Sequence, residues 1–218
     1  MHTRIKVGAR PSALALKQVQ EVFKSLPSIS VDIVKIFTAG DKDKSTSLSK
    51  EKNTSFFSDT IEKALLDGEI DVAVHSAKDL DDEPKEDLVI AAMTKTISPY
   101  DCLVSFNNST LDELPFGARI GTSSKARERG VLNYRGDLVV SDIRGNVDER
   151  IAKLDKGDFD AIVVAHAALI RLGLQNRMSQ LIHQNIIKPH CLQGRLAIQV
   201  KRSREDLINI FKGLNYEQ

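Results

Sequence analysis

The residues best suited to chemistry lie together at the end of one apolar run. The run 70–74 is followed at once by His75, Ser76, Lys78 and Asp79. The run predicts a short strand, and ligands of open α/β sheets bind outside the carboxyl ends of the strands. A carboxylate beside an ammonium can hold an anionic ligand with one group and stabilise a developing positive charge with the other. The alternative is a solvated turn whose charges pair with nothing in particular, with His75 as a structural hydrogen-bonding residue.

Two other turns could receive an anion at the start of a helix. Ser12 precedes a run of helix formers over 13–24, and an N-cap serine leaves backbone N–H groups exposed to a ligand. A Gly/Ser/Thr turn over 121–124 precedes a helix predicted over 125–133. This second turn lacks the Gly-Lys-Thr ending of a nucleoside triphosphate loop, so we interpret it as a cradle for a carboxylate or a simple phosphate.

Alternating strand and helix signals place these turns in an α/β fold. The segment Lys42 to Ser55 has almost nothing to bury and is interpreted as a mobile loop or lid. Glu62 is expected on a solvated helix face. Strands are predicted over 5–7, 31–37, 70–74, 88–93, 102–106, 119–121, 138–143, 159–165 and 196–200, and helices over 13–24, 57–66, 125–133, 147–155, 167–172 and 205–214.

The pattern restarts around Pro99, which predicts that the chain crosses into a second domain near 94–98. A second irregular segment over 188–195 predicts the return. We therefore expect one domain over residues 1–95 and 195–218, a second over 96–194, and a doubly connected hinge with a central cleft.

Composition excludes several classes of protein. The 31 Lys and Arg residues balance 30 Asp and Glu residues in 218, so there is no basic excess of the kind that nucleic-acid binding requires. The 2 cysteines, Cys102 and Cys191, lie far apart without metal-ligand spacing, which fits a reducing compartment and predicts no metal site. No stretch reaches the roughly 20 apolar residues of a membrane span. We expect a cytoplasmic monomer with no nucleic-acid or membrane partner.

Several motifs occur together in one order along the whole chain. Their order and approximate spacing are those of the porphobilinogen deaminase (hydroxymethylbilane synthase) family, which the sequence therefore resembles. The motifs are Val7 to Leu16, Thr38 to Asp41, Val74 to Asp79, Gly121 to Ser124, Arg144 to Val147, Asp160 to Val163 and Arg171 to Gly173.

The resemblance implies two domains like those of periplasmic binding proteins. It also implies a transferase of haem and porphyrin biosynthesis that joins porphobilinogen units with release of ammonia, on a dipyrromethane cofactor. Asp79 would be catalytic, and Lys78 would assist it and bind cofactor carboxylates. Substrate and cofactor carboxylates would be bound by Arg10, Ser12, Thr122, Ser123, Ser124, Arg127, Arg144, Arg150 and Arg171, since guanidinium binds carboxylate bidentately.

Departures from the family pattern bear on this expectation. The chain ends about where a third domain with the cofactor-bearing cysteine would begin, so that domain is expected to be absent or separately encoded. One of two paired arginines appears as Ala126, and a hinge alanine as Arg195. The dipyrromethane is therefore expected not to be covalently bound, with Cys191 as the remaining candidate for attachment. Two hypotheses stand: a porphobilinogen-polymerising transferase, or a non-catalytic binding module for an acidic pyrrole or other polycarboxylate.

Overall fold

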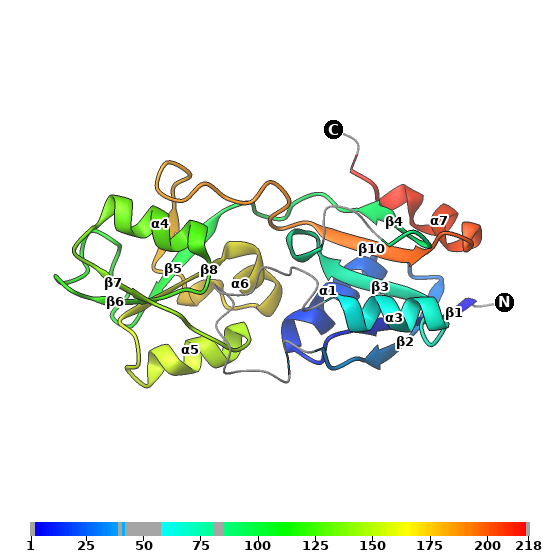
Figure 1. The fold of residues 1–218 in the computed structure, drawn as a ribbon, viewed down its shortest axis with the longest axis horizontal. Helices are drawn as coiled ribbons and strands as arrows, with labels where there is room; N and C mark the ends of the chain where they lie inside the picture. Colours follow the sequence, from blue (N-terminus) through cyan, green and yellow to red (C-terminus); the bar gives the residue numbers. More distant parts are fainter. Residues whose placement is uncertain (1–2, 39–40, 42–57, 81–84, 217–218) are drawn as a thin grey trace. The chain divides into compact units, whose positions relative to one another are not determined.

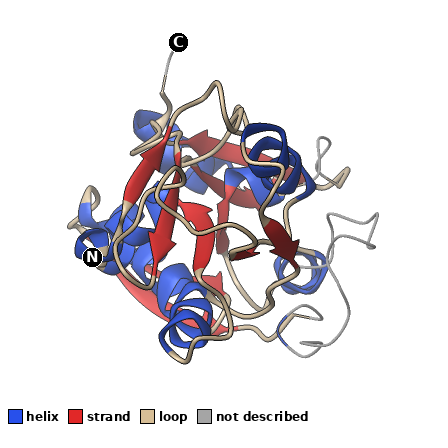
Figure 2. Ribbon diagram, turned by 90° about the vertical axis from the view of Figure 1, so that its left-hand side faces the viewer, coloured by secondary structure: helices blue, strands red, loops and turns tan. Residues whose placement is uncertain are grey.

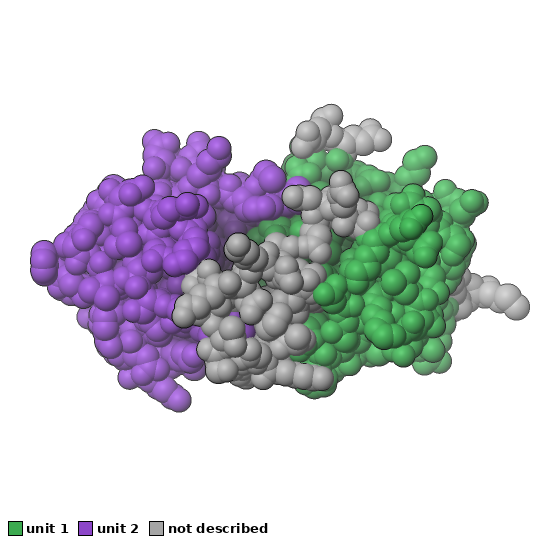
Figure 3. All heavy atoms as spheres, in the orientation of Figure 1, with its two compact units in different colours: residues 1–43, 53–97, 195–218 green, residues 44–52, 98–194 purple. Residues whose placement is uncertain are grey.

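The computed structural model describes residues 3–38, 41, 58–80 and 85–216. The lid predicted over Lys42 to Ser55 lies outside these residues. The chain forms two compact units, coloured separately in Figure 3. The described part of unit 1 is drawn from residues 1–43, 53–97 and 195–218, and the described part of unit 2 is 98–194. The chain passes from unit 1 to unit 2 after Ile97 and returns after Gly194.

Unit 1 is built on a five-stranded mixed sheet with the order β2-β1-β3-β10-β4 (Figure 1). Strand β1 is parallel to both β2 and β3, whereas β10 is antiparallel to β3 and β4. The strands are β1 (Thr3–Ala9), β2 (Ile29–Lys35), β3 (Val72–Ser76), β4 (Leu88–Met93) and β10 (Leu196–Lys201).

Helices cover both faces of this sheet because successive strand side chains point to opposite sides. Val72 and Val74 of β3 pack in one core with α1 (Ala13–Lys24) and α7 (Glu205–Phe211). Ala73 between them packs in the other core, against α3 (Asp59–Asp67). Figure 2 distinguishes the helices, in blue, from the strands, in red. The described residues of unit 1 also form two 3₁₀ turns, η2 (Ala77–Asp79) and η4 (Lys212–Leu214).

Unit 2 repeats this architecture with the order β7-β6-β8-β5-β9. Here β6 is parallel to β7 and β8, and β5 is antiparallel to β8 and β9. The strands are β5 (Asp101–Ser105), β6 (Arg119–Gly121), β7 (Val139–Ser141), β8 (Ala161–Ala165) and β9 (Gln180–Ile182), and the helices are α4 (Lys125–Tyr134), α5 (Val147–Asp155), α6 (His166–Leu172) and the 3₁₀ turn η3 (Gln175–Arg177).

The two faces of the second sheet are also filled separately. Val131 of α4 packs with Leu103 and Val163, while Leu154 of α5 and Leu169 of α6 pack in the opposite core. Two strands directly follow the points at which the chain changes units: β5 in unit 2 and β10 in unit 1. Strand β5 is antiparallel to β8, and β10 is antiparallel to β3.

The α/β class and most elements agree with the sequence predictions. The bounds of α1, α5 and β4 match those predicted. Strand β2 begins at Ile29 and ends at Lys35 rather than covering 31–37, and β7 keeps only three of the residues predicted over 138–143. Strand β9 was not predicted, because a three-residue segment has too little alternation to be recognised. The final helix ends at Phe211 and continues as the 3₁₀ turn η4.

Candidate functional site

The stretch after β3 carries the carboxylate and the ammonium in a 3₁₀ turn. Lys78 and Asp79 belong to η2, which begins directly after Ser76. The backbone N–H of Ala77 donates to the carbonyl of Arg195 at 3.1 Å, so the start of this turn is tied to the chain just before β10. Asp79 is exposed and Lys78 is partly buried. The strand therefore delivers Asp79 to the surface at its carboxyl end, where a substrate could reach it.

Beside this turn, unit 1 has a pocket of about 90 Å³. It is lined by polar groups from three places in the chain: Arg10 and Ser12 before α1, Ser58 before α3, and Ser76 at the end of β3. Gln18, His75, Asp79 and apolar side chains of α1, α3 and β3 complete its described lining. Two predicted ligand-binding residues and the predicted catalytic residue thus line one pocket.

Ser12 and Gln18 fix the side of this pocket formed by α1. Ser12 caps the helix by accepting a hydrogen bond from the N–H of Ala15 at 3.2 Å, as predicted for an N-cap serine. One turn on, the Gln18 amide nitrogen donates to the Ser76 hydroxyl at 2.8 Å. Gln18 is buried, which is unusual for glutamine, and this contact links α1 to the end of β3.

Arg10 is held by a carboxylate that the sequence analysis did not single out as a site residue. Its guanidinium donates to Asp41 through Nη2 at 2.5 Å and through Nε at 3.1 Å. Asp41 also accepts from the N–H and the hydroxyl of Thr38 at 3.0 and 2.8 Å. Burial by itself raises the pKa of Asp41, but these hydrogen bonds outweigh it and lower the pKa. Asp41 therefore stays ionised and orients the Arg10 guanidinium at the pocket.

His75 belongs to a buried polar chain behind the pocket. Its Nε2 lies 3.1 Å from the Gln199 amide oxygen, and the Gln199 amide nitrogen donates to Glu62 at 2.8 Å. Because the Gln199 oxygen can only accept, His75 Nε2 carries the proton and Nδ1 is an acceptor. Burial lowers the pKa of His75, so the ring is neutral. This agrees with a structural hydrogen-bonding histidine.

The same chain corrects the expectation for Glu62. This side chain is buried and not solvated, with 5% of the residue exposed. Besides Gln199, it contacts Lys85, whose Nζ lies 3.1 Å from Oε2. The ion pair and the amide hydrogen bond together explain how a carboxylate is accommodated on the inner face of α3.

In unit 2, the hydroxyls of the Gly/Ser/Thr turn stabilise the turn itself. Ser123 donates to the carbonyl of Ile143 at 2.6 Å, and Ser124 accepts from the N–H of Arg127 at 3.4 Å as the N-cap of α4. The N–H of Ser124 donates to the buried Thr122 hydroxyl at 3.3 Å. The side chains thus shape a loop that ends at a helix N-terminus, as the sequence predicted.

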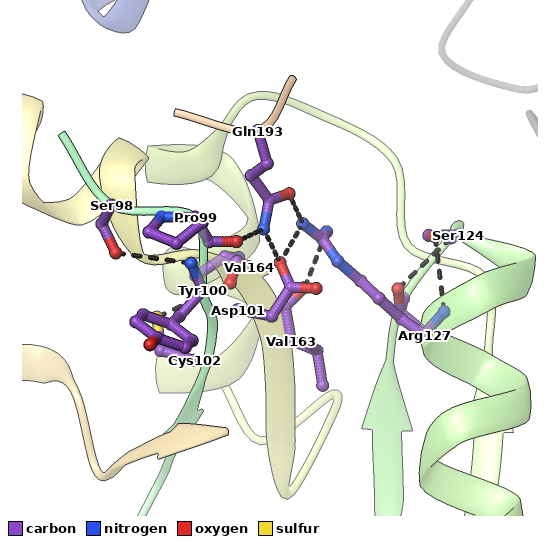
Figure 4. A network of polar contacts seen from close by, with 11 residues as sticks. Ser98, Pro99, Tyr100, Asp101, Cys102, Ser124, Arg127, Val163, Val164 and Gln193 are labelled. Carbon is purple, nitrogen blue, oxygen red and sulfur yellow. Dashed lines mark hydrogen bonds and ion pairs between the residues drawn. The ribbon is translucent and has the colours of Figure 1, made fainter. Parts of the chain in front are cut away.

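Arg127 points into unit 2, where it is bound by a network shown in Figure 4. Its Nη2 lies 2.7 Å from Asp101, and its Nη1 donates to the carbonyl of Val163 at 3.3 Å. Gln193 joins them: its amide nitrogen donates to Asp101 at 2.9 Å and to the carbonyl of Pro99 at 2.8 Å, and its oxygen accepts from Arg127 at 3.4 Å. The network ties the start of β5 to α4 and to the last residues of unit 2.

Two of the remaining predicted arginines of unit 2 also contact backbone carbonyls. Arg150 donates to the carbonyl of Gly145 at 2.8 Å, and Arg171 donates to that of Gly194 at 2.9 Å. Arg144 precedes Gly145, whose φ of 111° and close approach to Glu149 leave no room for a Cβ. Arg144, Arg150 and Arg171 are all partly exposed. The turn before α5 therefore has a fixed backbone from which Arg144 projects, and Arg150 projects from the helix that follows.

The two cysteines differ in their exposure to solvent. Cys102 is buried in β5, and burial raises the pKa of its thiol to about 12. Cys191 is exposed.

Among the described residues, no group of three or more His, Cys, Asp or Glu side chains could hold a metal ion. No helix in the described ranges is long and apolar enough to cross a membrane.

Comparison with known protein families shows which family this chain belongs to. The family model "Porphobilinogen deaminase, dipyromethane cofactor binding domain" matches residues 5–209. The chain belongs to the porphobilinogen deaminase family. The porphobilinogen deaminase of Natranaerobius thermophilus is 44% identical over 209 residues, which cover 94% of this chain and 67% of that protein. That of Buchnera aphidicola is 38% identical over 216 residues, covering 97% of this chain and 69% of that protein.

Solved structures agree on the fold. A nutrient binding protein from Burkholderia cenocepacia bound to methionine matches with a TM-score of 0.54 at 18% identity, covering 95% of this chain and 88% of that chain. An ancestral arginine-binding protein bound to arginine matches with a TM-score of 0.51 at 16% identity, covering 98% and 91%. The predicted two-domain, periplasmic-binding-protein-like α/β fold is thereby confirmed.

Proposed function

We propose that this chain acts in tetrapyrrole biosynthesis as a hydroxymethylbilane synthase, a transferase that joins porphobilinogen units and releases ammonia. Membership of the porphobilinogen deaminase family supports the reaction. The observation that carries the proposal in this molecule is the position of Asp79. It lies after β3 and lines a pocket that Arg10 and Ser12 also line.

Asp79 supplies the negative charge that the reaction needs. Loss of ammonia from porphobilinogen leaves a cationic azafulvene, and a fixed carboxylate near the pyrrole nitrogens stabilises that cation and handles its protons. The 3₁₀ turn η2 fixes the backbone that carries Asp79. One preorganised electrostatic group of this kind is worth roughly 3–4 kcal/mol of the barrier.

The cations of the site bind the acetate and propionate groups of the substrate. Lys78 presents an ammonium one residue before Asp79, and Arg10 is oriented by Asp41. We assign the same role in unit 2 to Arg144, Arg150 and Arg171. Charge-assisted hydrogen bonds to carboxylates are about twice as strong as neutral ones, so a few cations are sufficient in a chain with a net charge of +1.

The cations and the N–H and O–H donors of the site also fit a dipyrromethane, because its carboxylates need the same partners as those of the substrate. Lys78 would bind it in unit 1. In unit 2, Thr122, Ser123 and Ser124 shape the helix N-terminus that would receive a carboxylate, while Arg127 is directed at Asp101. When bound, the dipyrromethane supplies the pyrrole to which new units are added. We propose that it is not covalently attached here, with the exposed Cys191 as the alternative anchor.

A binding module without turnover is the second candidate. The observation that favours it is the engagement of one predicted clamp, Arg127, by Asp101, a buried carboxylate of the chain itself. In this case an acidic pyrrole or another polycarboxylate would bind and be released unchanged.

One experiment separates the two candidates. The purified chain is incubated with porphobilinogen, and ammonia release and linear tetrapyrrole formation are followed alongside the melting temperature. The transferase gives ammonia and tetrapyrrole, whereas the binding module gives only a raised melting temperature, by mass action. A melting temperature unmoved by millimolar porphobilinogen, together with no ammonia, contradicts both.

A further inference from the structure

Ser58 has a buried hydroxyl that the fold does not use. The residue directly precedes α3, is 2% exposed and lines the unit 1 pocket. A serine in this position ordinarily caps its helix from an extended backbone conformation. Here the backbone is helical, with φ −103° and ψ −35°, and the side chain makes no capping hydrogen bond. Only the carbonyl of Ser58 serves the helix, by accepting from the N–H of Glu62 at 2.9 Å.

The Ser58 hydroxyl oxygen has no hydrogen-bond partner in the described structure. A buried polar group without a partner destabilises the folded state, and such groups are rare enough that each needs an explanation. A structural role does not supply one, because within the described residues the hydroxyl neither caps the helix nor bonds to a neighbour. A ligand in the pocket would supply the missing partner.

The neighbouring hydroxyls indicate which ligand group this would be. Ser12 accepts from the Ala15 N–H, and Ser76 accepts from the Gln18 amide nitrogen. Each hydroxyl has one proton, and in the described part of the chain neither proton has an acceptor. Arg10 lines the same pocket and can only donate. This wall of the pocket is therefore rich in donors and suits an acceptor, in particular a carboxylate.

We infer that the Ser58 hydroxyl donates a hydrogen bond to a carboxylate of the bound pyrrole, beside the Ser12 and Ser76 hydroxyls, and so contributes to specificity for carboxylated ligands. The inference rests on the proposed function, because it takes the pocket to be a pyrrole site. It adds a ligand contact from the start of α3. The hydroxyl is retained for binding at the expense of the stability of the ligand-free protein.

The test compares Ser58→Ala with the matched control Ser203→Ala, an exposed serine of the same unit. Porphobilinogen affinity is measured by calorimetry, and thermal melting is measured without ligand. We expect Ser58→Ala to bind roughly 10- to 150-fold more weakly, the value of one charge-assisted hydrogen bond, and to melt at the same temperature as wild type or higher. Ser203→Ala should match wild type in both. Unchanged affinity, or a melting temperature several degrees lower, would overturn the inference.

A second ligand tests the carboxylate itself. With the dimethyl ester of porphobilinogen, the loss caused by Ser58→Ala should shrink, since the charged acceptor is gone. An undiminished loss would assign the hydroxyl to another group of the ligand and overturn the inference. These results are distinct from failure of the proposed function, in which wild type itself shows no affinity for porphobilinogen.

Discussion

Arg127 and Asp101 form a buried ion pair in unit 2, with their side chains 11% and 4% exposed and 2.7 Å between Nη2 and Oδ1. The two residues come from α4 and the first position of β5. Gln193 bonds to both, so the carboxylate and the guanidinium are satisfied by the protein without a ligand. Arg127 thus stabilises the second unit in the ligand-free protein, whatever it does when a ligand is bound.

Removing Asp101 should therefore be costly. Asp101→Ala leaves the Arg127 guanidinium buried without its carboxylate, and the expected loss is about 3–5 kcal/mol of unfolding free energy. The control is Asp155→Ala, which removes an exposed pair with Arg177 in the same unit and should cost less than about 1 kcal/mol. Denaturant titration followed by circular dichroism measures both. Equal, small losses would contradict the structural role of the pair.

The buried His75 predicts a pH dependence of stability. Burial lowers its pKa below the ordinary 6.5, against the opposing effects of Glu62, Gln199 and Asp79. The unfolded state therefore takes up a proton first as the pH falls. The contribution of neutral His75 to the free energy of unfolding is full above about pH 6.5. It is lost as the pH drops through the pKa of His75 in the folded state. Between about pH 7.5 and 5.5, wild type should lose more unfolding free energy than His75→Gln, and parallel curves would contradict this assignment.

Arg150→Ala tests the clamps of unit 2. Arg150 projects from the second turn of α5, and its removal should weaken binding of porphobilinogen by about 1.5–3 kcal/mol, the value of a charge-assisted hydrogen bond. Arg129→Ala is the control, because Arg129 is exposed on α4 and is expected to contribute only surface charge. Isothermal titration calorimetry measures both variants. If Arg150→Ala binds porphobilinogen as tightly as wild type, whatever the control does, Arg150 is not part of the site.

The intact mass of the purified protein tests covalent attachment. The thiol of Cys102, with a pKa raised to about 12, is buried and unreactive, which leaves Cys191 as the accessible sulfur. We expect the mass to equal that of the 24.1 kDa sequence and no colour with Ehrlich's reagent. An added mass equal to a dipyrromethane, mapped to Cys191, would show that the cofactor is covalently attached to this chain.

Sequence reasoning performed best where the signal is local. The helix over 13–24 with its Ser12 cap, and the turn that places Asp79 after a buried strand, follow from apolar spacing and capping residues. Contacts between distant residues were not predictable in the same way. Asp101 and Arg127 are 26 positions apart, and Arg10 and Asp41 are 31 apart. Nothing in either residue's own neighbourhood indicates its partner.

Ser58 shows a different limit. The helix predicted over 57–66 included Ser58, and only the structure shows that this serine precedes α3 with a hydroxyl that is not used for capping. Glu62 was expected in solvent because glutamate usually lies there, and its burial depends on Gln199, which is 137 positions away. Such polar contacts depend on how the strands are ordered in the sheet, which the local pattern does not determine.

The turnover of porphobilinogen by Asp79→Asn tests the central claim most directly. Asn has nearly the same size as Asp, and Asp79 is exposed, so the fold and the affinity for porphobilinogen should change little. Ammonia release should fall at least about 100-fold, because the amide cannot balance the positive charge of the azafulvene. The measurement is the rate of ammonia release under saturating porphobilinogen, with melting temperature as the control for folding. A well-folded Asp79→Asn protein that retains most of the wild-type rate would contradict the catalytic role of this carboxylate.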